Sequence, residues 1–315
     1  MSFDDKLEIN PSEVKKKIIE FLHINLEKRD VQGILIPYRH CIEAIINVHL
    51  AIETVGKNNV TLVVTHGRFG NHEPEKITDL NEIKRHLDIP EQNIIFANQE
   101  MILKEIREIY SHRYSSKTRH VISDFIPALN YNLSYHLLRD VVKNEMEQRT
   151  FTPSSTQPST QREKFIQKTI AHYKSQIRLR VILAFLFAET ENQSVIGCTN
   201  KTEFLLGLFT KFGTYYAADY LPLADLYLTQ IVQIANYLNL KEFFNPQETP
   251  YPSSYDYFFK LSSTEVDRIL IRLENGISVA EIAKSTGISQ KNVETVFNHY
   301  QKAEHARKVP IIPKI

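Results

Sequence analysis

The stretch from Gln32 to Ile45, QGILIPYRHCIEAI, decides the fold because it predicts a buried strand that turns directly into a helix. Residues 33–36 form an aliphatic run that begins at a glycine, and residues 40–54 have the apolar spacing of a helix. In α/β proteins, glycine amides at this first strand-to-helix turn normally hold a phosphate. The turn here contains no glycine and is made of Pro37, Tyr38, Arg39, His40 and Cys41. The stretch therefore has the frame of a nucleotide loop but is filled with larger side chains.

The same alternation of strand and helix continues outward from this stretch. Asn10 can cap a preceding helix whose apolar stripe contains Val14, Ile18, Phe21, Leu22 and Leu26. Further strands are predicted at residues 60–64, 93–97 and 194–197, and further helices at 80–87, 99–110, 163–189, 201–209 and 226–238. This order predicts an α/β fold with a doubly wound parallel sheet and right-handed crossovers. From residue 263 onward the pattern is all helical.

Composition limits the classes of function. The 315 residues are 42% hydrophobic, and 38 basic and 37 acidic residues give a formal charge of +1, so the charge favours neither nucleic acid nor an anionic membrane as a partner. No apolar run is long enough to span a membrane, and the acidic start MSFDDKLEIN is untypical of a signal peptide. We therefore expect a cytoplasmic protein without a membrane partner. Two distant cysteines give no disulfide framework.

Four segments carry a family resemblance. They are IGCTNKTE at residues 196–203 with FTKFG at 209–213, DYLPLADLYLTQ at 219–230, QIRLR at 176–180, and EHARKVPIIPK at 304–314. Together they resemble the ammonia-dependent NAD synthetases of the PP-loop ATP-pyrophosphatase superfamily. The resemblance implies a Rossmann-like, adenine nucleotide α-hydrolase-like fold with an all-helical C-terminal region. It also implies a homodimer.

The resemblance divides the chain into parts and assigns residues to a site. It implies a single domain at 1–315, with a degenerate PP-loop half at 10–110, an insertion and flexible linker at 111–161, a helix and dinucleotide-pocket-like segment at 162–240, and a helical region and tail at 241–315. A mobile lid is the alternative for the polar linker at 150–161. The implied nucleotide-binding residues are Arg178, Arg180, Thr199, Lys211, Asp219, His305 and Arg307, and Glu203 is the implied magnesium ligand.

The resemblance also shows what the opening stretch replaces. In a gap-free match, the serine and two glycines of the ATP loop become Arg39, His40 and Cys41, the aspartate becomes Glu43, and the last serine becomes Ala44. Glycine lets backbone amides approach a pyrophosphate closely, and these side chains do not. Arg39 and His40 could either fill the ATP volume together with Tyr38 or form a new anion contact. Three further family positions are lost, at Thr214, Leu228 and Ala306.

We therefore expect a divergent NAD synthetase-like protein without the ordinary ATP-dependent amidation of nicotinic acid adenine dinucleotide. It would retain nucleotide or dinucleotide binding, or act through a protein partner. The residues alone establish no cofactor, and the resemblance implies Mg and ATP or an adenine dinucleotide. The first alternative is a functional ammonia-dependent ligase with an altered loop. The second alternative is a DNA-binding regulator that uses a helix-turn-helix-like segment.

Two other motifs have competing interpretations. Cys41 and Cys198, with His40 and His66, could form a metal or thiol site, but their spacing has no metal signature and free cysteines are commonly buried apolar groups. Residues 277–296 have a helix-turn-helix pattern. Its second helix is roughly neutral, which favours a structural helical pair over a DNA reader.

Overall fold

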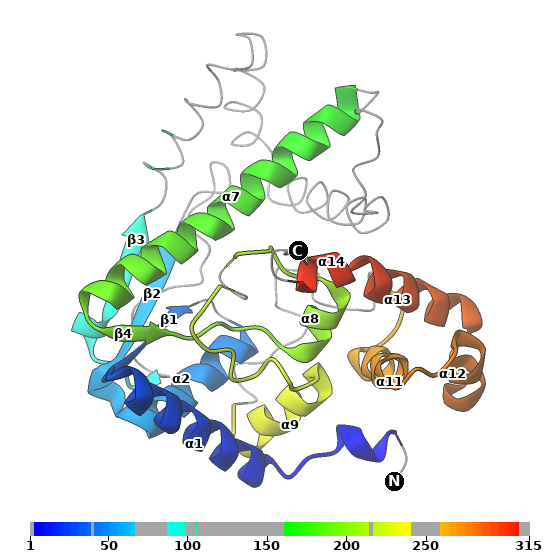
Figure 1. The fold of residues 1–315 in the computed structure, drawn as a ribbon, viewed down its shortest axis with the longest axis horizontal. Helices are drawn as coiled ribbons and strands as arrows, with labels where there is room; N and C mark the ends of the chain where they lie inside the picture. Colours follow the sequence, from blue (N-terminus) through cyan, green and yellow to red (C-terminus); the bar gives the residue numbers. More distant parts are fainter. Residues whose placement is uncertain are drawn as a thin grey trace, which may run out of the picture.

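The computed structural model describes residues 3–38, 41–66, 87–98, 102, 105, 161–213, 217–240 and 259–308. Its centre is a parallel sheet in which the described strands have the order β3-β2-β1-β4 (Figure 1). The strands are β1 (Gly33–Tyr38), β2 (Val60–His66), β3 (Ile94–Asn98) and β4 (Gln193–Val195). The doubly wound parallel sheet predicted from the sequence is thus confirmed, and β1 continues two residues beyond its predicted end.

The strand order creates a topological switch point between the carboxyl ends of β1 and β4, which is where open α/β sheets have their ligand crevice. Ile34 of β1 pairs with Val60 of β2 on one side, and Gly33 pairs with Gln193 of β4 on the other side. β2 and β3 therefore lie on one side of β1, and β4, which comes later in the chain, lies on its other side. In open α/β sheets, ligands bind at the carboxyl ends of the two strands that flank such a switch point. Here those ends belong to β1 and β4.

Helices cover both faces of the sheet (Figure 1). Ile34 and Ile36 of β1 belong to the same buried apolar cluster as α1 (Pro11–Arg29), α2 (Ile42–Val55) and α9 (Leu228–Tyr237). Leu35 points to the opposite face, where it packs with Ala184 and Ala188 of α7 (Gln161–Thr190). These strand residues are fully buried, as expected when successive side chains alternate between two covered faces.

The helix α1 begins as predicted. The Oδ1 atom of Asn10 accepts a hydrogen bond from the backbone N of Glu13, and a proline stands at the first helical position. Of the predicted stripe, Ile18, Leu22 and Leu26 are buried and Val14 is half-buried. Phe21 is the exception, since its side chain is 44% exposed and its ring contacts the ring of Tyr220 edge to face.

A second buried apolar cluster lies in the helical C-terminal region. It joins α8 (Lys201–Leu206) to α11 (Ser263–Glu274), α12 (Val279–Thr286) and α13 (Gln290–Lys302), and α14 (Glu304–Arg307) follows. Capping boxes at Ser262 and Ser278 begin α11 and α12. Leu228, at the start of α9, packs against both this cluster and the cluster under the sheet. The helical region is therefore continuous with the α/β core.

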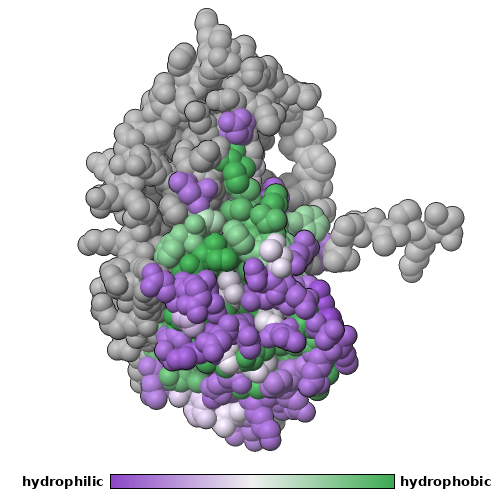
Figure 2. Space-filling view, turned by 90° about the vertical axis from the view of Figure 1, so that its left-hand side faces the viewer, coloured by the Kyte–Doolittle hydropathy of each residue, from purple (hydrophilic) through white to green (hydrophobic). Residues whose placement is uncertain are grey.

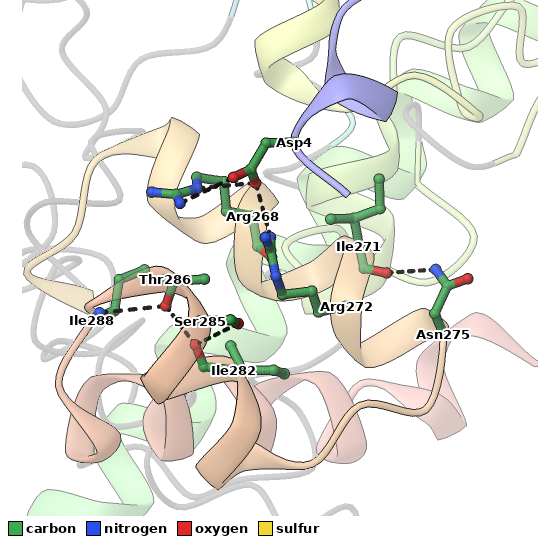
Figure 3. Close-up of polar contacts among 9 residues, drawn as sticks. All are labelled: Asp4, Arg268, Ile271, Arg272, Asn275, Ile282, Ser285, Thr286 and Ile288. Atoms are coloured by element: carbon green, nitrogen blue, oxygen red, sulfur yellow. Dashed lines mark hydrogen bonds and ion pairs between the residues drawn. The ribbon is translucent and has the colours of Figure 1, made fainter. Parts of the chain in front are cut away.

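The N-terminal segment ties this helical region to α9. The two carboxylate oxygens of Asp4 lie 2.9–3.1 Å from guanidinium nitrogens of Arg268 and Arg272 on α11 (Figure 3). These hydrogen bonds hold the pKa of Asp4 below its usual value. A few residues later, Leu7 is buried in the second cluster and its carbonyl accepts a hydrogen bond from Gln233 of α9.

Several element boundaries differ from those predicted. α2 begins at Ile42 instead of residue 40, and α9 begins at Leu228 instead of residue 226. α8 ends at Leu206, three residues early, because Gly207 has a φ of 69° and closes the helix in the left-handed conformation. Almost all of the helices predicted at 80–87 and 99–110, and all but the last residue of the linker at 150–161, lie outside the described residues. Within the described part, no helix is long and apolar enough to cross a membrane.

Candidate site at the carboxyl ends of β1 and β4

The junction between β1 and α2 has an ordinary backbone. Cys41 is the N-cap of α2, with φ −136° and ψ 156°, an extended conformation that any residue can adopt. Its side chain does not cap the helix, and Ala44 in the first turn is completely buried. At neither position does the chain offer a glycine amide or a hydroxyl to a phosphate. Arg39 and His40, which precede this turn, lie outside the described residues.

The end of β1 places an aromatic ring below this turn. Tyr38 lies on the same face of the sheet as Ile34 and Ile36 and belongs to the cluster on the α2 side. Its side chain is only 4% exposed. Tyr38 is thus a core residue. That Tyr38 fills the ATP volume together with Arg39 and His40 stays a prediction, because the latter two residues lie outside the described part of the chain.

Glu43 and Asn200 join the two junctions across the crevice. The Nδ2 atom of Asn200 donates a 2.8 Å hydrogen bond to Oε1 of Glu43, and both side chains are buried. The Oδ1 atom of Asn200 accepts a 2.8 Å hydrogen bond from the backbone N of Glu203, so Asn200 also caps α8. One amide group therefore fixes the carboxylate on α2 relative to the first turn of α8.

One helical turn further along α2, Asn47 continues this polar contact. Its Nδ2 atom donates to the carbonyl of Gly197 at 3.1 Å and lies 3.6 Å from Sγ of Cys198. Oδ1 of Asn47 and Oγ1 of Thr199 are buried, and neither has a hydrogen-bond partner within the described part of the chain. The crevice is thus lined by a polar strip with spare hydrogen-bonding capacity.

A second group of predicted site residues meets where α7 approaches the turn at residues 210–213. The Nε atom of Arg178 donates a 3.2 Å hydrogen bond to the carbonyl of Lys211. The approach is close, since a Cβ atom on Gly213 would lie 2.6 Å from Cγ2 of Ile177. The structure therefore brings Arg178 and Lys211 together, as expected. Arg180 lies half-buried on α7.

Arg307 lies against the carboxyl end of α8. Its Nη1 atom donates to the carbonyls of Leu205 and Tyr300, and its guanidinium lies 4.7 Å from the centre of the Tyr300 ring. Burial lowers the pKa of Arg307 from its usual value. The neighbouring Ala306 is 6% exposed, so the lost lysine position is now part of the packing. The side chain of His305 lies outside the described residues.

Asp219 lies apart from these groups. Its Oδ2 atom accepts a 2.8 Å hydrogen bond from the backbone N of Val195, and its Oδ1 atom lies 2.5 Å from Nη1 of Arg29. Arg29 is the last residue of α1, close to the point where β1 begins. In this structure the carboxylate holds the edge of the sheet, and its expected role in nucleotide binding stays a prediction.

Metal and cofactor chemistry finds limited support at this site. The described residues contain no group of three or more His, Cys, Asp or Glu side chains that could hold a metal ion, and Cys41 and Cys198 are free thiols. The side chain of Glu43 and the backbone N of Glu203 both contact Asn200, so Glu203, the expected magnesium ligand, lies in the helical turn that Asn200 caps. At the β1–α2 turn, Cys41 and Ala44 do not reproduce the serine and glycine residues of an ATP loop. Arg39 and His40 of the same turn lie outside the described residues, so the loss of ATP binding stays a prediction.

Three residues important to this geometry were not assigned a role from the sequence. Asn200 was quoted within a motif, and the spacing from Asn200 to Glu203 is a helix-capping signal that could have identified it. Asn47 is a lone amide in the apolar pattern of α2, which is also a detectable signal. Asp267 on α11 gave no local signal, because its partners are remote in sequence.

Comparison with known protein families gives one consistent result. The family model described as NAD synthase matches residues 130–310. The NH(3)-dependent NAD(+) synthetase of Thermotoga neapolitana is 24% identical over 303 residues, which cover 95% of each chain. That of Thermococcus sibiricus is 37% identical over 147 residues, which cover 44% of this chain and 56% of the relative.

Two solved structures are similar over nearly the whole fold. The NMN synthetase from Francisella tularensis and the NH3-dependent NAD synthetase from Campylobacter jejuni each superpose with a TM-score of 0.63 and 18% identity. Each comparison covers 98% of this chain and 100% of the other. At this identity the likeness concerns the fold.

Proposed function

The chain belongs to the NAD synthase family, and we propose that it is a member that no longer carries out the ordinary amide-forming reaction. That reaction activates the carboxylate of nicotinic acid adenine dinucleotide with ATP and then forms an amide with ammonia. Its first step requires a site that grips the pyrophosphate while charge develops on the phosphorus oxygens. The proposal is that this grip is lost while the scaffold around it is kept.

The first turn of α2 is the observation that carries the proposal. Cys41 stands there in an extended conformation, Ala44 is fully buried, and Tyr38 is buried at the end of β1. None of these side chains is a strong donor toward an anion. Two further positions that carry phosphate-neutralising lysines in the family now hold Leu228 and Ala306, which are packed against helices.

Parts of the ligand-contacting surface remain, which supports residual binding of a nucleotide or dinucleotide. Arg178 on α7 donates to the backbone carbonyl of Lys211, and Glu203 lies in the first turn of α8, which Asn200 caps. Thr199 has a buried hydroxyl without a partner in the described part of the chain. These groups offer positive charge and hydrogen bonds to a dinucleotide without supplying the machinery for its activation.

NAD formation by the purified protein tests the proposal. The assay contains ATP, magnesium, ammonium and nicotinic acid adenine dinucleotide, and Glu203→Ala is the matched control. We expect no turnover above the control. A rate of about 1 per second or more, abolished by Glu203→Ala, would instead establish the alternative, a working ligase with an altered loop. Thermal shift with ATP or the dinucleotide measures residual binding separately.

The DNA-binding alternative gains little from the structure. The exposed positions of α13 include Lys291 and Glu294, whose charges cancel, together with Gln290 and Asn298. Phosphate contacts in a DNA complex need basic side chains on the reading helix. A salt-dependent shift of duplex DNA would support the alternative, and we expect none.

We also propose a homodimer formed through the carboxyl half of α7. Ile182 and Leu186, one turn apart on this helix, have exposed fractions of 64% and 56%. Figure 2 shows apolar side chains gathered in the middle of the face that it presents, above a hydrophilic band. An apolar helix face of this kind is typical of a surface that a second subunit covers.

Light scattering tests the dimer. We expect a particle of twice 36.6 kDa for the wild-type protein. Leu186→Glu should give the single chain, because it places a charge in the centre of the apolar face. Phe21→Glu on α1 is a matched control at a similarly exposed aromatic, and it should remain dimeric. A single-chain wild-type particle at micromolar concentration would refute the dimer.

A further inference from the structure

Asp267 on α11 is a completely buried carboxylate that joins three helices. Its Oδ1 atom accepts a 2.6 Å hydrogen bond from the hydroxyl of Thr202 on α8. Its Oδ2 atom accepts two more from Thr229 on α9, one from the backbone N at 2.8 Å and one from the hydroxyl at 2.6 Å. Both oxygens are therefore engaged, and every donor comes from a helix other than α11.

These contacts also complete the start of α9. The backbone N of Leu228 donates a 2.8 Å hydrogen bond to Oγ1 of Thr202, whose own hydrogen goes to Asp267. The first two amides of α9 thus find partners in Thr202 and Asp267. A negative charge at a helix N-terminus is also favourable for the helix dipole. The position of α9 and that of α8 are consequently fixed by one carboxylate.

Thr202 lies in the middle of the segment that forms the candidate site. Asn200, two residues before it, contacts Glu43 of α2, and Glu203 follows it directly. α8 has six residues, so a shift at Thr202 moves its whole first turn. Through its hydrogen bond to Thr202, Asp267 links the C-terminal helix α11 to the position and orientation of the first turn of α8.

We propose that Asp267 is a positioning residue for the crevice between β1 and β4. By holding Thr202 it places Asn200 against the Glu43 carboxylate and sets Glu203 at the edge of the sheet. The expected effect of Asp267 on nucleotide affinity rests on the proposed residual nucleotide binding. Its effect on the positions of Asn200 and Glu203 is independent of that proposal.

The charge on Asp267 suits this role. Three donors converge on its two oxygens, whereas the side chain of an asparagine at this position would have only one acceptor atom. Burial raises the pKa of Asp267 to about 6, although the hydrogen bonds from Thr202 and Thr229 oppose the shift. The carboxylate form matches the donor pattern, whereas an asparagine would turn an NH₂ group toward one of them.

Hydrogen exchange of backbone amides in Asp267→Asn tests the proposal without any ligand. We expect the backbone amides of residues 41–47 and 199–206 to exchange about ten-fold faster than in the wild type, under conditions in which both proteins have the same free energy of global unfolding. Ser262→Ala is the control, since it removes the cap of α11 and destabilises the same helix without touching α8. It should leave exchange at 41–47 unchanged.

Nucleotide binding gives the second readout. If the wild-type protein binds Mg-ATP, Asp267→Asn should raise the dissociation constant about five-fold or more. The dissociation constant of Ser262→Ala should stay within about two-fold of the wild-type value. If the wild type binds none, residual binding fails, and the exchange result still decides the positioning role. Equal exchange at 41–47 in both variants would overturn the proposal. Should Asp267→Asn not fold, Thr202→Val removes the same link to α8 and is judged by the same outcomes.

Discussion

The two strand-to-helix junctions that meet at the carboxyl edge of the sheet have different characters. The junction after β1 carries Cys41 and Ala44, and neither side chain accepts a capping hydrogen bond from a backbone N–H of α2. The junction after β4 keeps Asn200, which caps α8 and holds Glu43 at the same time. The described part of the first junction has no capping side chain, whereas the second has an amide that links α8 to α2.

This difference shows that the scaffold and the chemistry of such a site depend on different residues. The scaffold depends on burial, and the apolar residues of β1 and α2 are as buried as any in the molecule. Phosphate binding depends on a few small residues whose loss leaves the packing intact. A loop can therefore lose its chemistry while the strand and helix around it remain in place. Four predictions test this contrast.

Asn200→Ala should have the largest effect on stability. It leaves the buried carboxylate of Glu43 without the hydrogen bond from Asn200 and removes the cap of α8. We expect a loss of about 3 kcal/mol in the free energy of unfolding. Urea denaturation of both proteins measures this loss. A loss below about 1 kcal/mol would mean that the second junction is no more structural than the first.

Gly213→Ala should have the next largest effect. The added methyl would lie 2.6 Å from Ile177 and 2.9 Å from the carbonyl oxygen of Thr210, which is backbone and cannot move aside easily. We expect about 2 kcal/mol of destabilisation from this overpacking. Gly276→Ala is the contrasting case, because nothing lies within 4 Å of its added Cβ and its cost of about 1–2 kcal/mol comes from the left-handed backbone at φ 74°. A loss below about 1 kcal/mol for Gly213→Ala would show that the close approach to α7 is not the reason that this glycine is present.

The helical region that holds the second junction should be sensitive to acid through His299. Burial against Phe259 lowers the pKa of His299 to about 4, with a smaller contribution from Lys302. Between pH 6.5 and 4 the unfolded chain therefore binds more protons than the folded one. The contribution of His299 to stability is complete above pH 6.5 and is lost as the pH falls toward 4.

A comparison of the wild type with His299→Gln isolates this effect. The difference between their free energies of unfolding should shrink by on the order of 1–2 kcal/mol across that window, allowing for partial exposure of the ring. Asp267 titrates in the opposite direction, but it is present in both proteins and its contribution cancels. A constant difference between pH 7 and pH 4 would show that His299 is not buried as a neutral group.

Cys41→Gly should have the smallest effect. The extended backbone at this N-cap suits either residue, so we expect a change of at most about 0.5 kcal/mol. We also expect no gain in Mg-ATP affinity, because one glycine does not restore the remaining donors. Thermal shift with and without Mg-ATP measures both quantities. A clear rise in affinity would show that the thiol side chain alone blocks the loop.

Much of the α/β half could be predicted from the sequence because its signals are local. Aliphatic runs such as Ile34 to Ile36 mark buried strands, and Asn10 with Pro11 marks the start of a helix. Boundaries were less accurate where the decision lies in backbone geometry. Residues 207–209 continue the helical pattern of α8, but Gly207 adopts the left-handed conformation at φ 69° and ends the helix there.

The site was predictable only in part. The motif residues identified which segments meet, and Arg178 does contact the backbone at Lys211. The contacts of Asp267 could not be predicted, because its partners are 65 and 38 positions away and depend on how the helices pack. Asp219 illustrates the same limit, since its contacts with Val195 and Arg29 depend on tertiary structure.

The N-terminal tie has a consequence for how the chain folds during synthesis. Asp4 is synthesised 264 positions before its partner Arg268. At cellular rates of elongation, that separation corresponds to roughly 10 to 50 s. During this time Leu7 has no second cluster to enter, and β1 also waits for β4, although for a shorter stretch of chain. The segment around Asp4 and Leu7 is therefore made long before its partners, which gives a chaperone a long opportunity to bind it.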